Sequence, residues 1–382
     1  MHNICKHFGS CGGCSYQDIP YQEQLYNKEK LIKELLSAHD FNHTVQPINA
    51  YPEWFYRNKM EFSFSSDRIL RCGLYKKGDH AQVVDLEECL IFSPYVGEIL
   101  GAVKNFAIQK NYTPYNKFSF QGFLRNLVIR KTQFTNEIMI GLVTTSKEKL
   151  NKDEFIKTLL SLSLAPSLKS IYWIINDSMS DAVMFEKKEL LYGSAFIQEE
   201  LSGFRFSIGI DSFFQINSTA IQDFYSKIRS YAALTGGERV LDLFCGMGCI
   251  GIFLARDAKF VWAVELQEEV IASAWENARM NAIDNISFFA SDVRKFLNSQ
   301  GMFYKDTELV VLNPPRSGLS NKIKRAVVRL TPHRIIYSSC NPSTLFSDLS
   351  EFLKNYTIER VEPFDFFPHT PHVECLVLLR KK

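Results

Sequence analysis

The 382-residue sequence has no long apolar run and no strong excess of charge of either sign. No stretch of about 18 uncharged apolar residues is present, and the first residues, MHNICKHFG, lack the basic and apolar regions of a secretory signal. The 44 lysines and arginines nearly balance the 42 aspartates and glutamates, so charge alone neither predicts nor excludes RNA binding. We expect a cytoplasmic, globular protein of about two domains, with no membrane partner.

The cysteines do not form the even set that is typical of a disulfide framework. Nine are present, and Cys5, Cys11 and Cys14 form the pattern Cys-x5-Cys-Gly-Gly-Cys. The two glycines allow a tight turn in which neighbouring thiolates meet on one ion or cluster. Cys89, just before an expected turn, is the candidate fourth ligand, whereas Cys72 lies in a strand-like run and is expected in the core. On spacing alone, a zinc ion and an iron-sulfur cluster both fit these cysteines. The alternative is that they bind no metal and are unpaired cysteines in a loose terminus.

Short runs rich in β-forming residues dominate the sequence from about residue 55 to 215. The run FLRNLVIRKTQFTNEIMIGLVTT is typical of a hairpin with its turn near Thr135 and Asn136. We therefore expect an antiparallel sheet, preceded by a helix within residues 15–38, where apolar residues recur at helical spacing. Residues 1–210 are predicted to form this α+β domain, and residues 211–382 a second domain.

Strands and helices alternate from about residue 215 onward, and the candidate strands are RVLDLFC, FVWAVEL, ISFFAS, ELVVLN and RIIYSS. This alternation predicts a parallel sheet with right-handed crossovers, which is a doubly wound, Rossmann-like α/β domain. The final segment, FDFFPHTPHVECLVLLRKK, is expected to add a last pair of strands at one edge of the sheet.

The turn after the first of these strands has the spacing G-x-G-x-x-G, formed by Gly246, Gly248 and Gly251. Such a turn lets the backbone approach a nucleotide-like ligand and points a helix N-terminus at it. Glu265, at the end of the next strand, is placed to accept hydrogen bonds from both ribose hydroxyls. NAD fits these features equally well. S-adenosylmethionine is favoured because Asp242 lies just before the glycines, Asp292 ends the third strand within reach of an adenosine, and no hydride-transfer site is evident.

The motif SSCNP follows the strand RIIYSS, at the edge where doubly wound sheets bind ligands. LNPPR ends the preceding strand, so Cys340 and Arg316 are expected to face one pocket. Carbon 5 of uracil is a poor nucleophile until a thiolate adds to carbon 6, and Cys340 is the candidate for this addition. Glu374 lies in an apolar strand and is the candidate base for the carbon 5 proton, with His369 and His372 as alternatives. The alternative is that Cys340 has no catalytic role and is simply a small buried apolar residue.

Seven motifs in order resemble those of the RNA uracil-C5 methyltransferases, the RumA, RumB and TrmA group: CKHFGSCGGC, ECLIFSP, DSFFQINSTA, VLDLFCGMGCIG, LNPPRSG, YSSCNP and FPHTPHVE. The resemblance covers nearly the whole chain and implies a class I methyltransferase domain with Cys340 as nucleophile and Glu374 as base. The residues that it places around S-adenosylmethionine are Gln215, Phe244, Glu265 and Asn313. The residues that it implies as ligands of a [4Fe-4S] cluster are Cys5, Cys11, Cys14 and Cys89.

The sequence departs from the family pattern at two places. Asn313 stands where many members have aspartate, so a negatively charged role does not carry over to this position. The cluster motif begins at Cys5, without the N-terminal RNA-binding barrel that many members carry. This combination is most similar to the RumB branch, which implies 23S rRNA as the substrate in preference to tRNA. We expect the protein to act as a monomer on a flipped uridine in a single-stranded loop.

Basic residues interleaved with apolar or aromatic ones are candidates for contact with RNA. These are Arg57, Lys59, Arg125, Arg130 and Lys131. A sheet face that pairs with phosphates and stacks bases would use such a pattern, and the solvated face of an ordinary strand explains it equally well. Phe213 and Phe214 are candidates for holding the flipped base, with core packing as the alternative.

Two other enzyme classes share part of this pattern. A radical enzyme combines S-adenosylmethionine with iron and sulfur, but it typically uses Cys-x3-Cys-x2-Cys, unlike the spacing from Cys5 to Cys14. A base-amino methyltransferase has an aromatic residue after NPP, whereas Arg316 follows it here. A catalytically silent RNA-binding or electron-carrying protein would need neither Cys340 nor Glu374.

Overall fold

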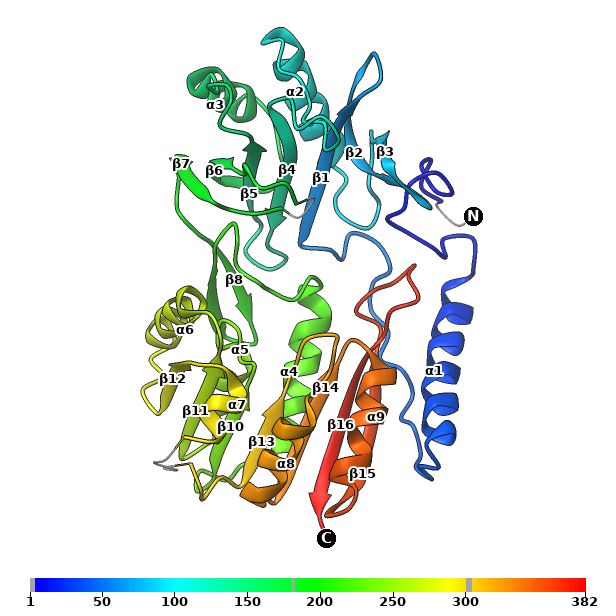
Figure 1. Cartoon of the computed structure of the whole chain (residues 1–382), viewed down its shortest axis with the longest axis vertical. Helices are drawn as coiled ribbons and strands as arrows, with labels where there is room; N and C mark the ends of the chain where they lie inside the picture. Colours follow the sequence, from blue (N-terminus) through cyan, green and yellow to red (C-terminus); the bar gives the residue numbers. More distant parts are fainter. Residues whose placement is uncertain (1–3, 181–182, 300–303) are drawn as a thin grey trace.

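The computed structural model describes residues 4–180, 183–299 and 304–382. Two seven-stranded sheets lie one above the other along the long axis of the molecule (Figure 1). The strands of the N-terminal sheet, in spatial order, are β3 (Asp79–Asp85), β2 (Leu70–Lys76), β1 (Lys59–Ser66), β4 (Leu124–Lys131), β5 (Glu137–Thr144), β6 (Ser167–Ile175) and β7 (Lys187–Gly193).

The N-terminal sheet is mixed, and not purely antiparallel as the sequence suggested. The β4–β5 hairpin is confirmed, and Asn136 in its turn has φ 55°. β5 and β6, however, run parallel, because the helix α3 (Lys152–Leu160) connects them and a parallel pair needs such a crossover. A second helix, α2 (Val96–Gln109), packs with α3 on one face of this sheet. The opposite face of β1 carries polar side chains.

The C-terminal sheet confirms the predicted α/β architecture. Its strands, in spatial order, are β12 (Ile286–Ala290), β11 (Phe260–Glu265), β10 (Arg239–Leu243), β13 (Leu309–Leu312), β14 (Arg334–Ser339), β16 (Glu374–Lys381) and β15 (Tyr356–Phe364). The first five are parallel, and β16 is antiparallel to both β14 and β15.

Helices cover both faces of the C-terminal sheet. Those on one face are α4 (Ser218–Ala232), α5 (Cys249–Ala255) and α6 (Glu268–Met280). Those on the other are α7 (Val293–Leu297), α8 (Asn321–Leu330), α9 (Pro342–Phe352) and α1 (Tyr21–Ala38). Each central strand is buried on both sides, as in other parallel sheets.

The expected pair of strands within residues 364–382 was placed too late in the sequence. β15 ends at Phe364, and residues 365–373 form a loop that leads into β16. Pro368 and Pro371 lie in this loop, and a proline cannot donate a hydrogen bond to a neighbouring strand. The pair therefore lies at the edge as expected, but with β15 as the outer strand.

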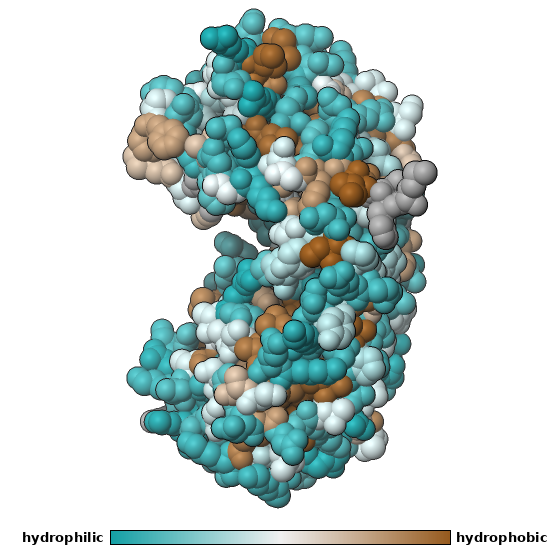
Figure 2. All heavy atoms as spheres, turned by 90° about the vertical axis from the view of Figure 1, so that its right-hand side faces the viewer, coloured by the Kyte–Doolittle hydropathy of each residue, from teal (hydrophilic) through white to brown (hydrophobic). Residues whose placement is uncertain are grey.

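The first helix packs far from the sheet that follows it in the sequence. Ile32 and Leu36 of α1 join the core of the C-terminal sheet, and Val45 bridges Val361 of β15. The two-stranded ribbon of β8 (Ile197–Leu201) and β9 (Phe204–Ile208) packs against α4 and α6. Figure 2 shows a hollow between the upper and lower lobes of the molecule. A domain boundary at residue 210 stays a prediction. No helix in the described ranges is long and apolar enough to cross a membrane.

Candidate active site and cysteine cluster

The candidate nucleophile and the candidate base lie opposite one another at the ends of neighbouring strands. β14 and β16 are antiparallel, with Ser339 opposite Cys375. Cys340 follows β14 directly and Glu374 is the first residue of β16, so the same register brings these two residues together. Strand pairing, which is fixed by the buried core, therefore positions both groups.

The carboxyl group of Glu374 is held in an apolar environment. The residue is 2% exposed, and no hydrogen bond or ion pair to its carboxyl group is found in the part of the chain that the structure describes. Burial raises the pKa of Glu374 to about 8, because a charge is poorly stabilised there. A carboxyl group with such a pKa is a stronger base than an exposed one and holds a proton near neutral pH.

The thiol of Cys340 is half-buried at the start of α9. Burial raises its pKa, and the nearby Glu374 raises it further, while Arg316 lowers it. Cys340 therefore lies between a carboxyl group and a guanidinium group, and ionisation of the thiol depends on both.

Side-chain hydrogen bonds join the loops that follow β13 and β14. Ser338 donates from Oγ to Oδ1 of Asn313 (2.9 Å), and Asn341 donates from Nδ2 to the carbonyl oxygen of Arg316 (3.0 Å). The guanidinium of Arg316 lies 3.1 Å from Nδ1 of His372, measured from Nη2. The two predicted loops thus meet in space, with Asn313, Arg316 and Cys340 on neighbouring strand ends.

The glycine turn and the acidic end of β11 are also adjacent. The backbone N–H of Gly246 donates to Oε2 of Glu265 (3.2 Å), and Leu266 donates to the other carboxylate oxygen (2.7 Å). Gly246 has φ 53°, and a Cβ added there would meet nothing within 4 Å. Phe244 also has a positive φ, 65°. This open, left-handed turn leaves space for a ligand beside Glu265.

Asp242 is a fully buried acid of the C-terminal sheet. It lies in β10, and neither of its carboxyl oxygens has a partner among the residues that the structure covers. Burial raises its pKa to about 7, although the Gly251 backbone offsets part of the rise. A buried polar group left unpaired indicates that something else satisfies it.

Two predicted cofactor residues have other contacts in the structure. Asp292 caps α7, since its Oδ1 accepts a hydrogen bond from the Lys295 N–H (2.9 Å). Gln215 is half-buried ahead of α4, and its backbone carbonyl accepts from Nδ2 of Asn58 (2.7 Å). The contact with Asn58 ties the backbone of Gln215 to the segment just before β1.

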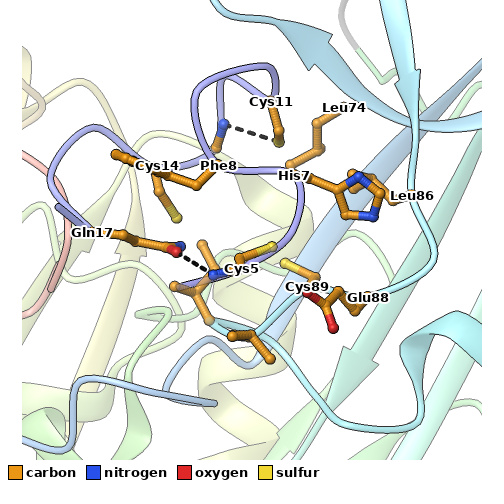
Figure 3. Close-up of a pocket in the computed structure, with 13 residues that line it drawn as sticks. Cys5, His7, Phe8, Cys11, Cys14, Gln17, Leu74, Leu86, Glu88 and Cys89 are labelled. Atoms are coloured by element: carbon orange, nitrogen blue, oxygen red, sulfur yellow. Dashed lines mark hydrogen bonds between the residues drawn. The ribbon is translucent and has the colours of Figure 1, made fainter. Parts of the chain in front are cut away.

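The four predicted cluster ligands line one pocket, shown in Figure 3: Cys5, Cys11, Cys14 and Cys89. Burial raises the pKa of Cys89 to about 12, and the other three sulfurs add to the rise, which shows how near they lie. All are free thiols. Cys72 lies apart from the pocket and is fully buried, which confirms its place in the core.

The described residues hold no group of three or more His, Cys, Asp or Glu side chains that could bind a metal ion. This finding supports neither a zinc ion nor the predicted cluster. A [4Fe-4S] cluster requires four thiolates from one pocket, one for each iron. The donors fit that group in type and number, and the cluster itself stays a prediction.

Most of the basic residues predicted to contact RNA are used inside the protein. Arg130 is buried and donates to the carbonyl oxygen of Ile210 (3.0 Å), and Lys131 donates to that of Phe55 (2.8 Å). The guanidinium of Arg125 donates to backbone carbonyls at 176 and 178 (2.9 and 2.6 Å). Arg57 and Lys59 instead line a cavity of about 450 Å³ together with Phe213, which is 66% exposed.

The loop before Glu374 is held by residues that the sequence did not reveal as functional. Gln24 of α1 accepts at Oε1 from the N–H of His369 (2.9 Å), and the buried Lys28 pairs with Asp365 (2.6 Å). Backbone N–H groups of residues 15 and 16, just after the cysteines, donate to the carbonyl of His369 (2.8 and 3.1 Å). The sequence does contain a sign that Gln24 and Lys28 are buried, because both lie on the same face of the helix as the apolar Ile32.

The chain is similar to proteins named as RNA methyltransferases over nearly its whole length. The family model described as tRNA (uracil-5-)-methyltransferase matches residues 20–382. A Clostridium tetani protein named as an uncharacterized RNA methyltransferase is 39% identical over 388 residues, which cover 99% of this chain and 84% of that protein. A protein of the same description from Caldanaerobacter subterraneus is also 39% identical, over 100% of this chain and 85% of its own.

One solved structure is similar both in fold and in sequence. It is the crystal structure of the Pyrococcus abyssi tRNA (uracil-54, C5)-methyltransferase in complex with S-adenosyl-L-homocysteine. The TM-score is 0.82 at 29% identity, over 97% of this chain and 86% of that one. The doubly wound domain and these relatives define an S-adenosylmethionine-dependent methyltransferase that acts on RNA. The chain belongs to the tRNA (uracil-5-)-methyltransferase family, and carbon 5 of uracil is where it places the methyl group.

Proposed function

We propose that this RNA uracil-5-methyltransferase acts through a covalent adduct, with Cys340 as the nucleophile and Glu374 as the base. The observation that carries the proposal is the register of β14 and β16, which sets a half-buried thiol opposite a buried carboxyl group of raised pKa. Arg316 beside the thiol favours its ionised form, as a nucleophilic cysteine requires.

The reaction that these residues perform begins with addition of the Cys340 thiolate to carbon 6 of the uracil, which makes carbon 5 nucleophilic. S-adenosylmethionine, when bound, would supply the methyl group: carbon 5 would bond to it as the bond from the methyl group to the sulfonium sulfur breaks, which would leave S-adenosylhomocysteine. Glu374, which must be in its ionised form at this step, then accepts the proton from carbon 5. The electrons of the broken C–H bond restore the ring double bond, and the bond from carbon 6 to the sulfur of Cys340 breaks. The enzyme returns to its starting state after the proton leaves Glu374.

The residues proposed to hold S-adenosylmethionine are Gln215, Phe244, Gly246, Glu265, Asp292 and Asn313. The fit is supported by the open left-handed turn at Gly246 and by the orphaned carboxyl group of Asp242. Glu265 already binds backbone N–H groups, so its carboxylate is oriented before a ribose arrives. Asn313 is oriented by Ser338 and contributes no charge.

We further propose that the four pocket cysteines hold a [4Fe-4S] cluster. Their thiols converge on one apolar pocket, and burial raises the pKa of each, so that the protonated forms dominate without a metal. Iron would replace these protons, because the thiolate is the ligand form. The segment that follows the cysteines bonds to His369, so order in the cysteine loop supports the loop that carries the base.

The proposed substrate is 23S rRNA, modified at a uridine in a single-stranded loop. This rests on the four-cysteine pocket, which the sequence motifs associate with the rRNA branch of the family. The alternative is tRNA, which is favoured by the similarity to the Pyrococcus abyssi enzyme. Arg57, Lys59 and Phe213 are proposed to contact the RNA, because they line a cavity beside the segment that leads to Gln215. Either substrate places the enzyme in the cytoplasm.

The experiment that tests the proposed function uses S-adenosylmethionine labelled in its methyl group and unmodified transcripts of 23S rRNA and of tRNA. Digestion and nucleoside analysis should find label in 5-methyluridine from 23S rRNA only. Label in 5-methyluridine from tRNA alone would select the alternative substrate. Label in another nucleoside, or in none, would overturn the chemistry proposed for Cys340.

A further inference from the structure

The uncovered face of the N-terminal sheet carries a second cavity, of about 380 Å³, that the reaction does not use. Four aromatic residues line it, namely Phe64 from β1, Tyr75 from β2, and Tyr115 and Phe118 from the loop before β4. Ser63 and Ser65 of β1 also line it. We call this site the aromatic pocket. We propose that it binds an unpaired base of the RNA substrate at a distance from the target uridine, which rests on the proposed action on RNA.

Cations lie on the rings of the aromatic pocket. The guanidinium carbon of Arg125 is 4.3 Å from the ring centroid of Tyr115. The ammonium nitrogen of Lys117 is 5.5 Å from the centroid of Tyr75 and 5.7 Å from that of Phe118. Positive charge interleaved with aromatic rings complements a nucleotide, which carries both a stacking surface and a negative phosphate. Both cations are held beside the rings by hydrogen bonds to backbone carbonyls, Arg125 to those of residues 176 and 178 and Lys117 to that of His80.

The pocket is held open by its own hydrogen bonds. Oδ1 of Asn116 accepts from the backbone N–H groups of Phe118 (2.8 Å) and Ser119 (3.0 Å), and Lys147 donates to the carbonyl of Phe120. Phe118 is nevertheless 74% exposed, which leaves its ring free to contact a partner. Because these hydrogen bonds already hold the backbone of the loop, stacking of a base on the Phe118 ring costs little conformational entropy.

The pocket lies on the same face of β1 as the cavity near the catalytic domain. Alternate residues of a strand share a face, so Lys59 is on the side of Ser63 and Ser65. Lys59 lines the cavity that contains Phe213, and Ser65 lines the aromatic pocket. With a rise of about 3.3 Å per residue, the six steps from Lys59 to Ser65 span roughly 20 Å. An extended RNA strand that follows β1 away from the catalytic domain would therefore reach the aromatic pocket.

The serines and Asn126 supply hydrogen-bonding groups at the floor of the pocket. Asn126 donates from Nδ2 to Oγ of Ser63 (3.2 Å), and this polar pair lies beside the aromatic rings. Stacking rings above a polar floor are suited to a base, which presents a flat π-face and a hydrogen-bonding edge.

Binding of unstructured RNA tests this proposal without relying on methylation. The probes are fluorescein-labelled oligouridines of fifteen and of four nucleotides, because only the longer one can occupy both cavities. Phe118→Ala and Tyr115→Ala should raise the dissociation constant of the fifteen-mer about fivefold to a hundredfold, as expected for one lost stacking contact, and raise that of the four-mer by less, because a short probe can still bind in the cavity that contains Phe213. Tyr26→Ala is the matched control, since Tyr26 is 66% exposed on α1, and it should change neither constant.

Fifteen-mer binding by Phe118→Ala that equals wild-type binding would overturn the proposal, as would an equal loss for both probe lengths. Phe118 is exposed, so its truncation should leave the melting temperature unchanged and the variant folded. A length-dependent loss of binding in a protein that methylates no uridine would overturn the proposed function and leave the aromatic pocket as an RNA-binding site.

Discussion

Replacing Glu374 by glutamine is expected to stabilise the fold while it removes the activity. Burial raises the pKa of this carboxyl group to about 8 from its ordinary 4.5, and no hydrogen bond or ion pair compensates within the described residues. Between these two pH values the unfolded chain is ionised and the folded chain keeps its proton. Folding must therefore take up a proton, which glutamine does not require.

The magnitude follows from the size of the pKa shift. Each pH unit above 4.5 costs the folded state about 1.4 kcal/mol, so the cost is about 3 kcal/mol at pH 7 and levels off at about 5 kcal/mol above pH 8. The sign is fixed because the pKa of the folded state lies above that of the unfolded state. The wild-type free energy of unfolding thus falls, relative to the variant, as the pH rises from 4.5 to 8.

Urea unfolding at pH 5, 6, 7 and 8 measures this difference directly. The gap in unfolding free energy between Glu374→Gln and wild type should widen by about 1.4 kcal/mol per pH unit. Glu34→Gln is the control, because Glu34 is 62% exposed on α1 and its replacement should change stability little at any pH. A gap of the same size at pH 5 and pH 8 would show that Glu374 is not a buried acid of raised pKa.

Three further outcomes follow from the site. Cys340→Ala should lower kcat at least a hundredfold while the dissociation constant of S-adenosylmethionine stays within about twofold, which isothermal titration would verify, because the thiol acts on the base. Cys89→Ser should reduce the iron content of anaerobically purified protein from about four per chain, whereas Cys72→Ser should not; zinc in place of iron would contradict the cluster. Gln24→Ala leaves the His369 N–H without its acceptor and the Tyr16 and Ile19 carbonyls without their donor, and it should lower kcat about tenfold; a kcat equal to that of wild type would contradict this positioning role.

The sequence was sufficient for the features that depend on local order along the chain. Cys340 and Glu374 each stand at one end of a strongly apolar strand, and neighbouring strand ends meet at one edge of a sheet. The hairpin turn at Asn136 was readable because its flanking runs alternate and its turn residue tolerates a positive φ. Cys72 was correctly placed in the core for the same local reason.

The features that depend on contacts distant in sequence could not be predicted. The residue pattern of α1 predicts neither that its apolar face packs on the C-terminal sheet nor that Lys28 pairs with Asp365. The parallel pair of β5 and β6 was missed because the helix between them was not recognised. Arg130 was a candidate for RNA contact, with a solvated strand face as the alternative, but a buried arginine that donates to a backbone carbonyl has the same sequence context.

The most direct test of the covalent mechanism uses Glu374→Gln with methyl-labelled S-adenosylmethionine and the RNA that the wild type modifies. Glutamine cannot accept the carbon 5 proton, so Cys340 should add and the methyl group should transfer, but the adduct should not break down. A denaturing gel should then show a slower protein band that carries the methyl label and that disappears when Cys340→Ala is added to the same chain. Normal turnover by Glu374→Gln, or loss of activity without a labelled band, would contradict the role of Glu374 as the base.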